Sequence, residues 1–376
     1  MSFDEAQKIY LDYNASTPIA PEVVEAMRPF LTEHYGNPSS SHWAGMPARN
    51  AVENARAEVA MLIGADPSEI ILTSSGTESN NHALKGIFFA DRTKGNHIIT
   101  TAVEHPSILD PCRFLGKFGA EITVLPVDRF GMVDPDDVRR AITSGTILVS
   151  VMHANNEVGT IQPIAEISRI VKDAGALFHT DASQSIGKIP ASVDALGVDL
   201  LSIAGHKLYA PKGIGALYIR KGTEINPLIH GAGQESGRRA GTENVLLAVA
   251  LGAACSIADK LDMSRIQELR DRFHKRLQEI FEKKITLNGH PTDRLPNTLN
   301  VNFIGRSGTE ILNIMPNIAA STGSACHSGL STLSPVLAAM HVSPEEGMGA
   351  VRFSLGRYTT WDEIEAVLEL LRSALS

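Results

Sequence analysis

The residue with the clearest chemical potential is Lys207, in the segment Ala-Gly-His-Lys-Leu at 204–208. It lies in a turn of small residues between two apolar runs, 200–203 and 215–219. Desolvation of a lysine is costly and lowers the pKa of its amine, which makes the amine a better nucleophile toward a carbonyl carbon. We therefore predict that Lys207 forms a Schiff base.

Two other polar segments also follow apolar runs. Residues 73–80, Thr-Ser-Ser-Gly-Thr-Glu-Ser-Asn, form a small-residue turn before a helix, where free N–H groups and the helix dipole favour a phosphate near Thr77. An ordinary capped helix start fits this segment equally well. His105 follows the run that begins at His97 and places an imidazole at the mouth of the sheet, although a loop histidine is usually a surface residue.

Amide and carboxylate groups end two further runs. Residues 153–159, His-Ala-Asn-Asn-Glu-Val-Gly, offer amides that can bind a carboxylate or a ring oxygen, but an Asn-rich turn is commonly only a turn. Asp181 ends an apolar run, where it caps a helix or pairs with a cation such as a protonated pyridine nitrogen. Along the chain the order is phosphate turn, His, Asn, Asp and Lys, which is the order of a pyridoxal-phosphate site.

Short apolar runs that alternate with helical patterns must position these residues. The expected strands are 69–73, 97–101, 121–125, 146–152, 176–180, 200–203 and 215–219, with helices such as 163–174 between them. Apolar runs of this length are typical of central strands in a mostly parallel sheet that helices cover on both faces. The predicted fold class is α/β, and ligands of such sheets bind beyond the carboxyl ends of the strands.

A chain of 376 residues is too long for one hydrophobic core of ordinary size. A charged amphipathic helix is expected at 263–283, followed by strands at 299–303 and 350–354 and a closing helix at 360–375. We expect a large cofactor-binding domain at 16–260. Residues 1–15 together with 261–376 are expected to form a smaller α+β domain that carries a mobile cysteine loop.

Composition and charge exclude several classes of function. The net charge is −8 and no run is rich in Lys or Arg, which argues against nucleic-acid and anionic-membrane partners. The cysteines, Cys112, Cys255 and Cys326, are far apart and indicate neither a disulfide framework nor a metal site. No signal-peptide pattern or apolar run of membrane-spanning length occurs. We expect a soluble protein of the cytoplasm.

The chain closely resembles the cysteine desulfurases of the NifS/IscS family, which are fold-type I pyridoxal-phosphate transferases, and also the related selenocysteine lyases. The matching segments extend over essentially the whole chain: Tyr10-Leu-Asp-Tyr-Asn-Ala, Gly36-Asn-Pro-Ser-Ser, Ser75-Gly-Thr-Glu, Asn155-Asn-Glu-Val-Gly-Thr, Gly205-His-Lys, residues 233–244, Ser324-Ala-Cys and Arg352-Phe-Ser-Leu-Gly-Arg. So many ordered matches make the resemblance specific.

The resemblance implies a pyridoxal 5'-phosphate cofactor that Lys207 holds as a Schiff base, with His105 stacked on its ring. Asp181 is implied to pair with the ring nitrogen and Gln184 with the phenolic oxygen. The implied phosphate ligands are Gly76, Thr77, His206 and, from the partner subunit of a homodimer, Thr242. Asn156, which also borders the cofactor, and Arg352 are implied to hold the substrate carboxylate, which a guanidinium binds with two parallel hydrogen bonds.

The implied reaction converts L-cysteine to L-alanine and leaves the sulfur on Cys326 as a persulfide. Residues 320–329 are small and look mobile and exposed, as a reactive thiolate requires, whereas Cys112 and Cys255 are expected to be inert and buried. The spacing from Cys326 to Arg352 matches the family branch in which a long loop carries the sulfur to a scaffold or carrier protein, for example in iron-sulfur cluster assembly.

The sequence departs from the family pattern at some positions. Ala204 replaces a usual phosphate-binding Ser, a contact that Ser202 should not be assumed to restore, and Ser75 replaces a Gly. Ala232 and Ser236 alter the segment before Arg238. Ala204, together with the His that follows Cys326, also resembles selenocysteine lyases, which act on L-selenocysteine. A weakly active scaffold protein and a plain aminotransferase are the remaining alternatives.

Overall fold

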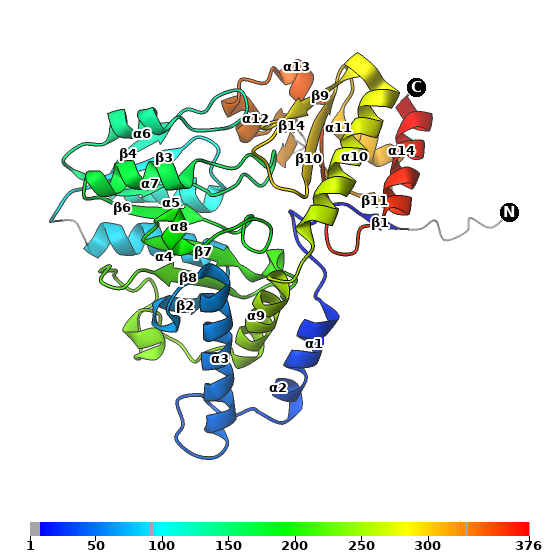
Figure 1. The fold of residues 1–376 in the computed structure, drawn as a ribbon. Helices are drawn as coiled ribbons and strands as arrows, with labels where there is room; N and C mark the ends of the chain where they lie inside the picture. Colours follow the sequence, from blue (N-terminus) through cyan, green and yellow to red (C-terminus); the bar gives the residue numbers. More distant parts are fainter. Residues whose placement is uncertain (1–7, 91–92, 323, 328–329, 376) are drawn as a thin grey trace.

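A seven-stranded sheet forms the centre of the larger part of the molecule (Figure 1). The structure, a computed structural model, describes residues 8–90, 93–322, 324–327 and 330–375, and their side chains outside 323–332. In the order of the sheet the strands are β2 (Ile70–Thr73), β8 (Gly215–Ile219), β7 (Leu200–Ala204), β6 (Leu177–Asp181), β5 (Thr146–Ser150), β3 (His97–Thr101) and β4 (Glu121–Leu125). Only the two pairs that involve β8 are antiparallel. The predicted α/β class is confirmed.

Two layers of helices cover this sheet. The helices of the larger part are α1 (Pro21–Met27), α2 (Pro29–Thr32), α3 (Gly45–Ile63), α4 (Gly76–Ala90), α5 (Pro106–Gly116), α6 (Pro135–Ala141), α7 (Ile164–Asp173), α8 (Val193–Leu196) and α9 (Val245–Ala258). Successive strand residues point to opposite faces. Ile71 therefore packs with α4 and α5, and its neighbours Ile70 and Leu72 pack with α3 and α9 on the other face. Burial on both faces explains the continuous apolar runs in the sequence.

The parallel arrangement brings the carboxyl ends of six strands to one edge of the sheet. Those of β7, β6, β5, β3 and β4 are there directly, and β2 joins them because it is antiparallel to β8, which is itself antiparallel to β7. Five of these strands, all except β4, end in Thr73, Thr101, Ser150, Asp181 and Ala204. The polar segments of the sequence therefore start from a common edge.

A second, smaller core lies at the C-terminal side of the molecule. Its elements are β1 (Ile9–Tyr10), α10 (Met263–Phe281), β9 (Ile285–Asn288), β10 (Thr298–Phe303), α11 (Gly308–Ile314), β11 (Ile318–Ala319), β12 (Ser321–Thr322), β15 (Ala350–Ser354) and α14 (Trp361–Leu375). An antiparallel sheet in the order β12-β15-β10-β9 packs with α10 and α14, and Ile9 and Leu11 join this core. We propose the division into domains 16–260 and 1–15 with 261–376, which this separate core supports.

The segment around Cys326 is a β-hairpin in the part of its backbone that is described. Strands β13 (Ser324–His327) and β14 (Leu330–Leu333) pair in antiparallel register, with Cys326 opposite Ser331. The short helices α12 (Pro335–Ala339) and α13 (Pro344–Gly347) follow. Val336 and Leu337 of α12 are buried in the core of the larger part. The C-terminal end of the hairpin is thus anchored on the larger core.

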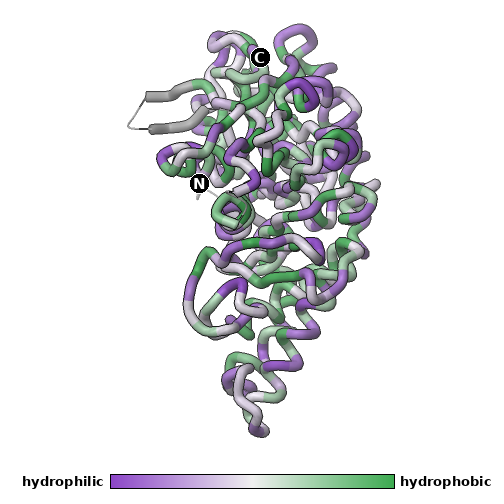
Figure 2. The backbone as a smooth tube through the Cα atoms, turned by 90° about the vertical axis from the view of Figure 1, so that its left-hand side faces the viewer, coloured by the Kyte–Doolittle hydropathy of each residue, from purple (hydrophilic) through white to green (hydrophobic). Residues whose placement is uncertain are grey.

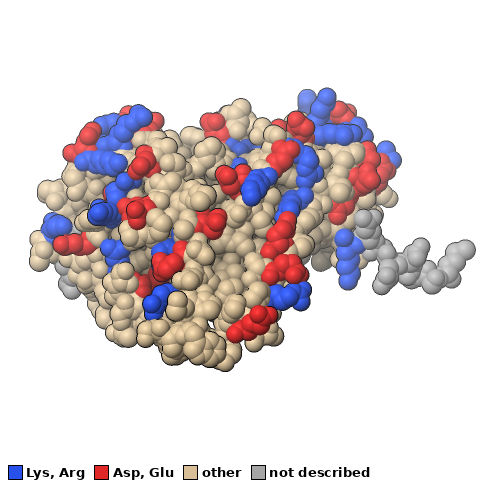
Figure 3. Space-filling model, turned by 60° about the horizontal axis from the view of Figure 1, so that its bottom comes forward, with Lys and Arg blue, Asp and Glu red and all other residues tan. Residues whose placement is uncertain are grey.

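Several of the helices are amphipathic, and charges of both signs are distributed over the surface. Along the helical segments of the tube in Figure 2, hydrophilic and hydrophobic residues alternate. On the face shown in Figure 3, basic and acidic side chains are interspersed, and neither sign forms a continuous patch there. Within the described residues, no helix combines the length and the apolar character needed to cross a membrane.

A buried ion pair fastens α3 to the sheet. Arg56 donates to both carboxylate oxygens of Glu235, at 2.6 and 3.0 Å, and also to the carbonyl oxygen of Ile70. Glu235 in turn accepts from the N–H of Leu72 at 3.0 Å. The side chain of Glu235 is 2% exposed. Solvent therefore cannot replace either partner.

Replacing Glu235 by Ala should lower the free energy of unfolding by about 3–5 kcal/mol, because it removes the buried counter-ion of Arg56 and leaves only the exposed carboxylate of Glu53, at 3.4 Å. Urea unfolding of the apoprotein, followed by circular dichroism, measures this change. The matched control is Glu25→Ala, which breaks an exposed pair with Arg28 and should leave the midpoint unchanged. Equal effects of the two substitutions would contradict the prediction.

Candidate active site

A cavity of about 440 Å³ lies at the common edge of the strands. The predicted site residues that line it are Gly76, Thr77, His105, Asn156, Asp181, Gln184, His206, Lys207 and Arg352. They come from the turns after β2, β3, β5, β6 and β7 and, in the case of Arg352, from β15 of the smaller part. The structure thus brings together residues that are far apart in the sequence.

One end of the cavity is shaped for a small anion. Gly76 begins the 15-residue helix α4, whose first turn leaves N–H groups without partners inside the helix. A Cβ at Gly76 would lie 2.9 Å from the hydroxyl oxygen of Ser183 and 3.1 Å from the Cβ of Ala204. The turn is therefore closely packed against Ser183 and Ala204 at this position. Burial lowers the pKa of His206, which also lines this end, to about 4, so that its imidazole is neutral at pH 7.

Asp181 places a buried carboxylate in the middle of the cavity. Its oxygens accept from the Asn80 side-chain amide at 2.7 Å and from the N–H of Ser183 at 2.9 Å. No ion pair of the described residues includes Asp181, and the Oδ1 atom of Asn80 has no hydrogen-bond partner there. A carboxylate that is 7% exposed and lacks a counter-ion fits a ligand with a cationic N–H group.

His105 is fixed by the start of α5. It is the N-cap residue, and its Nδ1 accepts from the N–H of Ser107 at 3.1 Å. Because Nδ1 is the acceptor, the neutral ring carries its proton on Nε2. Burial lowers the pKa of His105, although the charge of Asp181 acts in the opposite direction. The residue is thus a neutral, oriented ring on the wall of the cavity.

Lys207 follows β7 in a short 3₁₀ turn, Gly205–Lys207. Its ammonium donates to the carbonyl oxygens of Asn14 and Ala15, the latter at 2.8 Å. Burial and the positive charge of Arg352 lower the pKa of Lys207 to about 8, although Asp12 and Asp181 act in the opposite direction. An amine with this pKa is partly neutral near pH 7, as Schiff-base formation requires.

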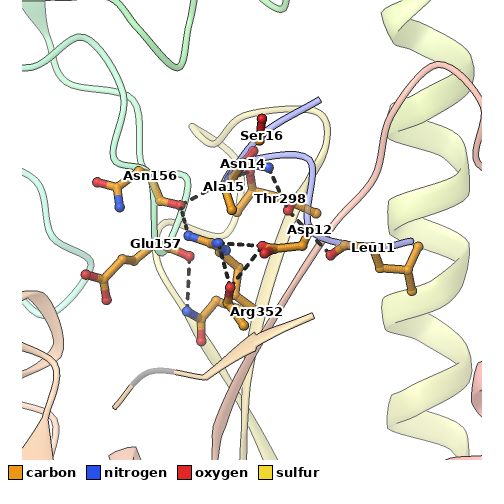
Figure 4. Close-up of polar contacts among 12 residues, drawn as sticks. Leu11, Asp12, Asn14, Ala15, Ser16, Asn156, Glu157, Thr298 and Arg352 are labelled. Atoms are coloured by element: carbon orange, nitrogen blue, oxygen red, sulfur yellow. Dashed lines mark hydrogen bonds and ion pairs between the residues drawn. The ribbon is translucent and has the colours of Figure 1, made fainter. Parts of the chain in front are cut away.

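Arg352 lies beside the cavity with its guanidinium 9% exposed. As Figure 4 shows, one Nη donates to the carbonyl oxygen of Asn156 at 2.9 Å, and the other donates to Asp12 at 2.6 Å. The second Nη also donates to Ser321 at 2.9 Å. The Nε atom is buried, and no described residue accepts from it. Three of the five N–H groups thus hold the guanidinium in place, and two have no acceptor among the described residues.

Two predicted site residues, Thr242 and Cys326, are not among the described residues that line the cavity. Thr242 lines a separate depression with Thr73 and Asn244 and is not part of the cavity wall of its own chain. Cys326 belongs to β13, and its side chain lies outside the described part of the structure. Cys112 and Cys255 are buried as expected, and burial raises the pKa of each thiol to about 12.

The sequence analysis missed several residues of the cavity wall. Asn14, Asn80, Ser107 and Ser183 all line it, and Asn14 and Asn80 lie within segments quoted above without a role. Ser202 is absent from the wall because its hydroxyl hydrogen-bonds His179 at 3.0 Å beneath the cavity. The sequence does not distinguish Ser107 and Ser183 from serines outside the cavity, because the direction of a side chain at a turn depends on the tertiary fold.

The low pKa of Lys207 gives the first prediction for the site. At pH 7 its amine should be neutral roughly 300 times more often than that of an exposed lysine of ordinary pKa, and it should react correspondingly faster. Reductive methylation of the apoprotein, quantified at each lysine by mass spectrometry between pH 6 and about 10, measures this difference.

Two variants test the cause of the low pKa. Arg352→Met removes a positive charge and should raise the pKa of Lys207, whereas Asp12→Asn removes a negative charge and should lower it. Shifts of the same sign in both variants would show that the charges of Arg352 and Asp12 do not control the amine.

Comparison with known proteins is consistent with this geometry. The sequence profile of the aminotransferase class-V family matches residues 9–367. The chain is 52% identical to the cysteine desulfurase IscS of Dictyoglomus turgidum, over 97% of this chain and 94% of the relative. It is 49% identical to the cysteine desulfurase IscS of Methanosarcina thermophila, over 98% and 92% of the two chains.

Solved structures of similar proteins point to the same family as the sequence comparisons. A NifS-like protein superposes with a TM-score of 0.92 at 38% identity, over 98% of this chain and 99% of the other. A structure described as SspA in complex with cysteine superposes with a TM-score of 0.84, also at 38% identity, over 94% of this chain and 100% of the other. The chain therefore belongs to the aminotransferase class-V family, in its group of NifS/IscS-type cysteine desulfurases.

Proposed function

We propose that the protein is a pyridoxal-phosphate-dependent cysteine desulfurase that converts L-cysteine to L-alanine and transfers the sulfur to Cys326. One observation carries the proposal. The low-pKa amine of Lys207, the unpaired carboxylate of Asp181 and the guanidinium of Arg352 line one cavity. These groups suit, respectively, an aldehyde, a protonated pyridine and a carboxylate. The cysteine desulfurase names of the relatives and the cysteine-bound SspA structure support the choice of substrate.

The residues present fit the cofactor. The carboxylate of Asp181, which has no ion-pair partner among the described residues, suits the ring nitrogen, and the N–H groups at the start of α4 suit the phosphate. The remaining proposed contacts are Thr77 and His206 with the phosphate, His105 with the ring face, Gln184 with the phenolic oxygen, Asn156 with the cofactor edge and Lys207 with the aldehyde. When bound, pyridoxal phosphate supplies an electron sink for the carbon that loses a proton.

The chain's own groups then have distinct tasks. Arg352 and Asn156 orient the substrate carboxylate, and Lys207 takes the proton from Cα at Nζ, for which a pKa of about 8 is well matched. Cys326 attacks the substrate sulfur as a thiolate, so that an S–S bond forms and the C–S bond breaks. Protonation of the carbon side completes alanine, and the sulfur stays on Cys326 as a persulfide.

A homodimer follows if Thr242 completes the site of a second copy. Its position outside the cavity of its own chain supports this arrangement. Large apolar side chains are exposed near α2 and the start of α3, among them Tyr35 at 79% and Trp43 at 78%. Exposed apolar residues of this size commonly mark a protein interface. The face in Figure 3 also shows a broad area without charged side chains.

The persulfide is proposed to pass to a sulfur-accepting scaffold or carrier protein, with iron-sulfur cluster assembly as one destination. The place of Cys326 on a β-hairpin supports delivery to a partner. A cytoplasmic location is proposed because the few, scattered cysteines suit a reducing compartment. Selenocysteine lyase activity is not favoured, because the curated relatives above are named cysteine desulfurases.

Cys326→Ala should abolish sulfide release from L-cysteine in the presence of a thiol reductant, because no other described thiol is positioned to accept the sulfur. Alanine and sulfide are quantified for the purified protein. Cys112→Ala and Cys255→Ala are the matched controls and should keep their activity, because both thiols are buried. Full activity of Cys326→Ala would instead favour a plain aminotransferase.

The same assay separates the remaining alternatives. Wild-type protein should form alanine from L-cysteine at a readily measured rate. Alanine from L-selenocysteine alone would identify a selenocysteine lyase, and a yellow protein without turnover on either substrate would identify a scaffold.

Thr242→Val should weaken pyridoxal-phosphate binding roughly 10- to 100-fold, because a hydrogen bond to a charged group contributes about 1.5–3 kcal/mol. A mixed dimer locates the contact. One subunit carries Lys207→Ala and the other Thr242→Val. If Thr242 acts on the partner's site, the mixed dimer contains one wild-type site with wild-type affinity. If Thr242 acts within its own subunit, that site stays weak, which excludes the contact between subunits.

A further inference from the structure

Lys188 is a part-buried lysine beside the cavity for which the proposed reaction has no task. It lies in the helical turns that follow Asp181, four residues after Gln184. Gly187 has a φ of +71°, and a Cβ there would lie 2.8 Å from the Cβ of Ala258 and 2.9 Å from Leu208. The turn at Gly187 therefore packs between α9 and Leu208. This packing fixes the backbone position of the next residue, Lys188.

The ammonium of Lys188 contacts only neutral oxygens among the described residues. Nζ donates to Oε1 of Gln184 at 3.0 Å and to Oδ1 of Asn14 at 3.3 Å. No ion pair of the described chain includes Lys188, and the charged groups that act on it, Lys207 and Arg352, are both positive. Burial, together with these two charges, lowers the pKa of Lys188 to about 7. Such a cation is unfavourable unless an anion binds nearby.

The contact with Lys188 fixes the orientation of the Gln184 amide. Lysine can only donate, so the atom that it contacts must be the amide oxygen. The NH₂ group of Gln184 then points the other way and donates to the carbonyl oxygen of Asn14 at 2.9 Å. That carbonyl also accepts from Lys207, and Gln184, Asn14 and Lys207 all line the cavity. Lys188 therefore makes Gln184 a donor on the cavity wall.

We propose that Lys188 is a positioning residue of the cofactor site. It holds the Gln184 amide so that its N–H groups face the phenolic oxygen of bound pyridoxal phosphate, and its positive charge stabilises the anionic form of that oxygen. This inference rests on the cofactor named under the proposed function. It assigns a task to a residue that reaches the cofactor only through Gln184.

The test follows the visible absorbance of the holoprotein as a function of pH, which reports protonation of the cofactor bound to Lys207. Lys188→Met removes a positive charge near the chromophore and should raise its apparent pKa by about one unit. Lys188→Arg keeps the positive charge and should shift the apparent pKa of the chromophore by less than half as much. Lys260→Met is the matched control, because Lys260 is exposed and does not line the cofactor cavity, and it should leave the pKa of the chromophore unchanged.

A double-mutant cycle tests whether Lys188 acts through Gln184. Gln184→Leu should raise the pKa of the chromophore in the same direction, and the shifts of Lys188→Met and Gln184→Leu should be clearly less than additive in the double variant. Lys188→Gln serves as a second neutral variant if Lys188→Met does not fold. An unchanged pKa in the folded neutral variants, with only a lower melting temperature, would reduce Lys188 to a structural role and overturn the proposal.

The result can be separated from the proposed function. Alanine formation by the wild type tests the desulfurase activity, whereas the pKa comparison needs only a bound chromophore. A yellow wild-type protein that forms no alanine from L-cysteine would refute the activity, and the pH titrations would still decide the role of Lys188.

Discussion

The arrangement of the site depends on the hydrogen bonds of Asn14, a buried residue of the N-terminal segment. Its carbonyl oxygen accepts from Lys207 and from Gln184. Its side chain and N–H group are bonded to Lys188, Asn156, Asn297, Thr298 and Ser354. These partners come from both the larger and the smaller part of the molecule. A buried amide with all of its polar atoms satisfied fixes its neighbours more firmly than a surface contact does, because solvent cannot replace any of them.

The close packing around Asn14 also brings several charged side chains together at the cavity. The cavity wall and its immediate surroundings hold three cationic side chains, Lys207, Lys188 and Arg352, against the carboxylates of Asp181 and Asp12. Burial and mutual repulsion lower the pKa of both amines. An anionic ligand relieves the repulsion, whereas a neutral one does not. The same excess of positive charge suits the proposed cofactor binding and the proposed proton transfer by Lys207.

The two parts of the chain meet where the substrate is proposed to bind. Arg352 comes from β15 of the smaller sheet, yet its guanidinium contacts Asn156 of the larger part (Figure 4). The next residue, Glu157, accepts from the hydroxyl of Ser334 at 2.5 Å, directly after β14 of the cysteine hairpin. The turn at 156–157 thus contacts the carboxylate-binding arginine and the base of the hairpin together. This coupling explains why residues so far apart in sequence serve one site.

The sequence by itself determined the fold class, the strands of the central sheet and half of the residues of the cavity wall. Apolar runs buried on both faces leave a direct pattern, and polar residues at their carboxyl ends must meet when the strands are parallel. Only the tertiary structure placed Asn14, Asn80 and Ser183 on the cavity wall and Lys188 beside it. Their positions depend on how turns pack against distant segments, such as Gly187 against α9, and no local periodicity encodes such contacts. It also showed that Thr242 faces away from its own cavity, because that placement depends on the path of the chain between β8 and α9.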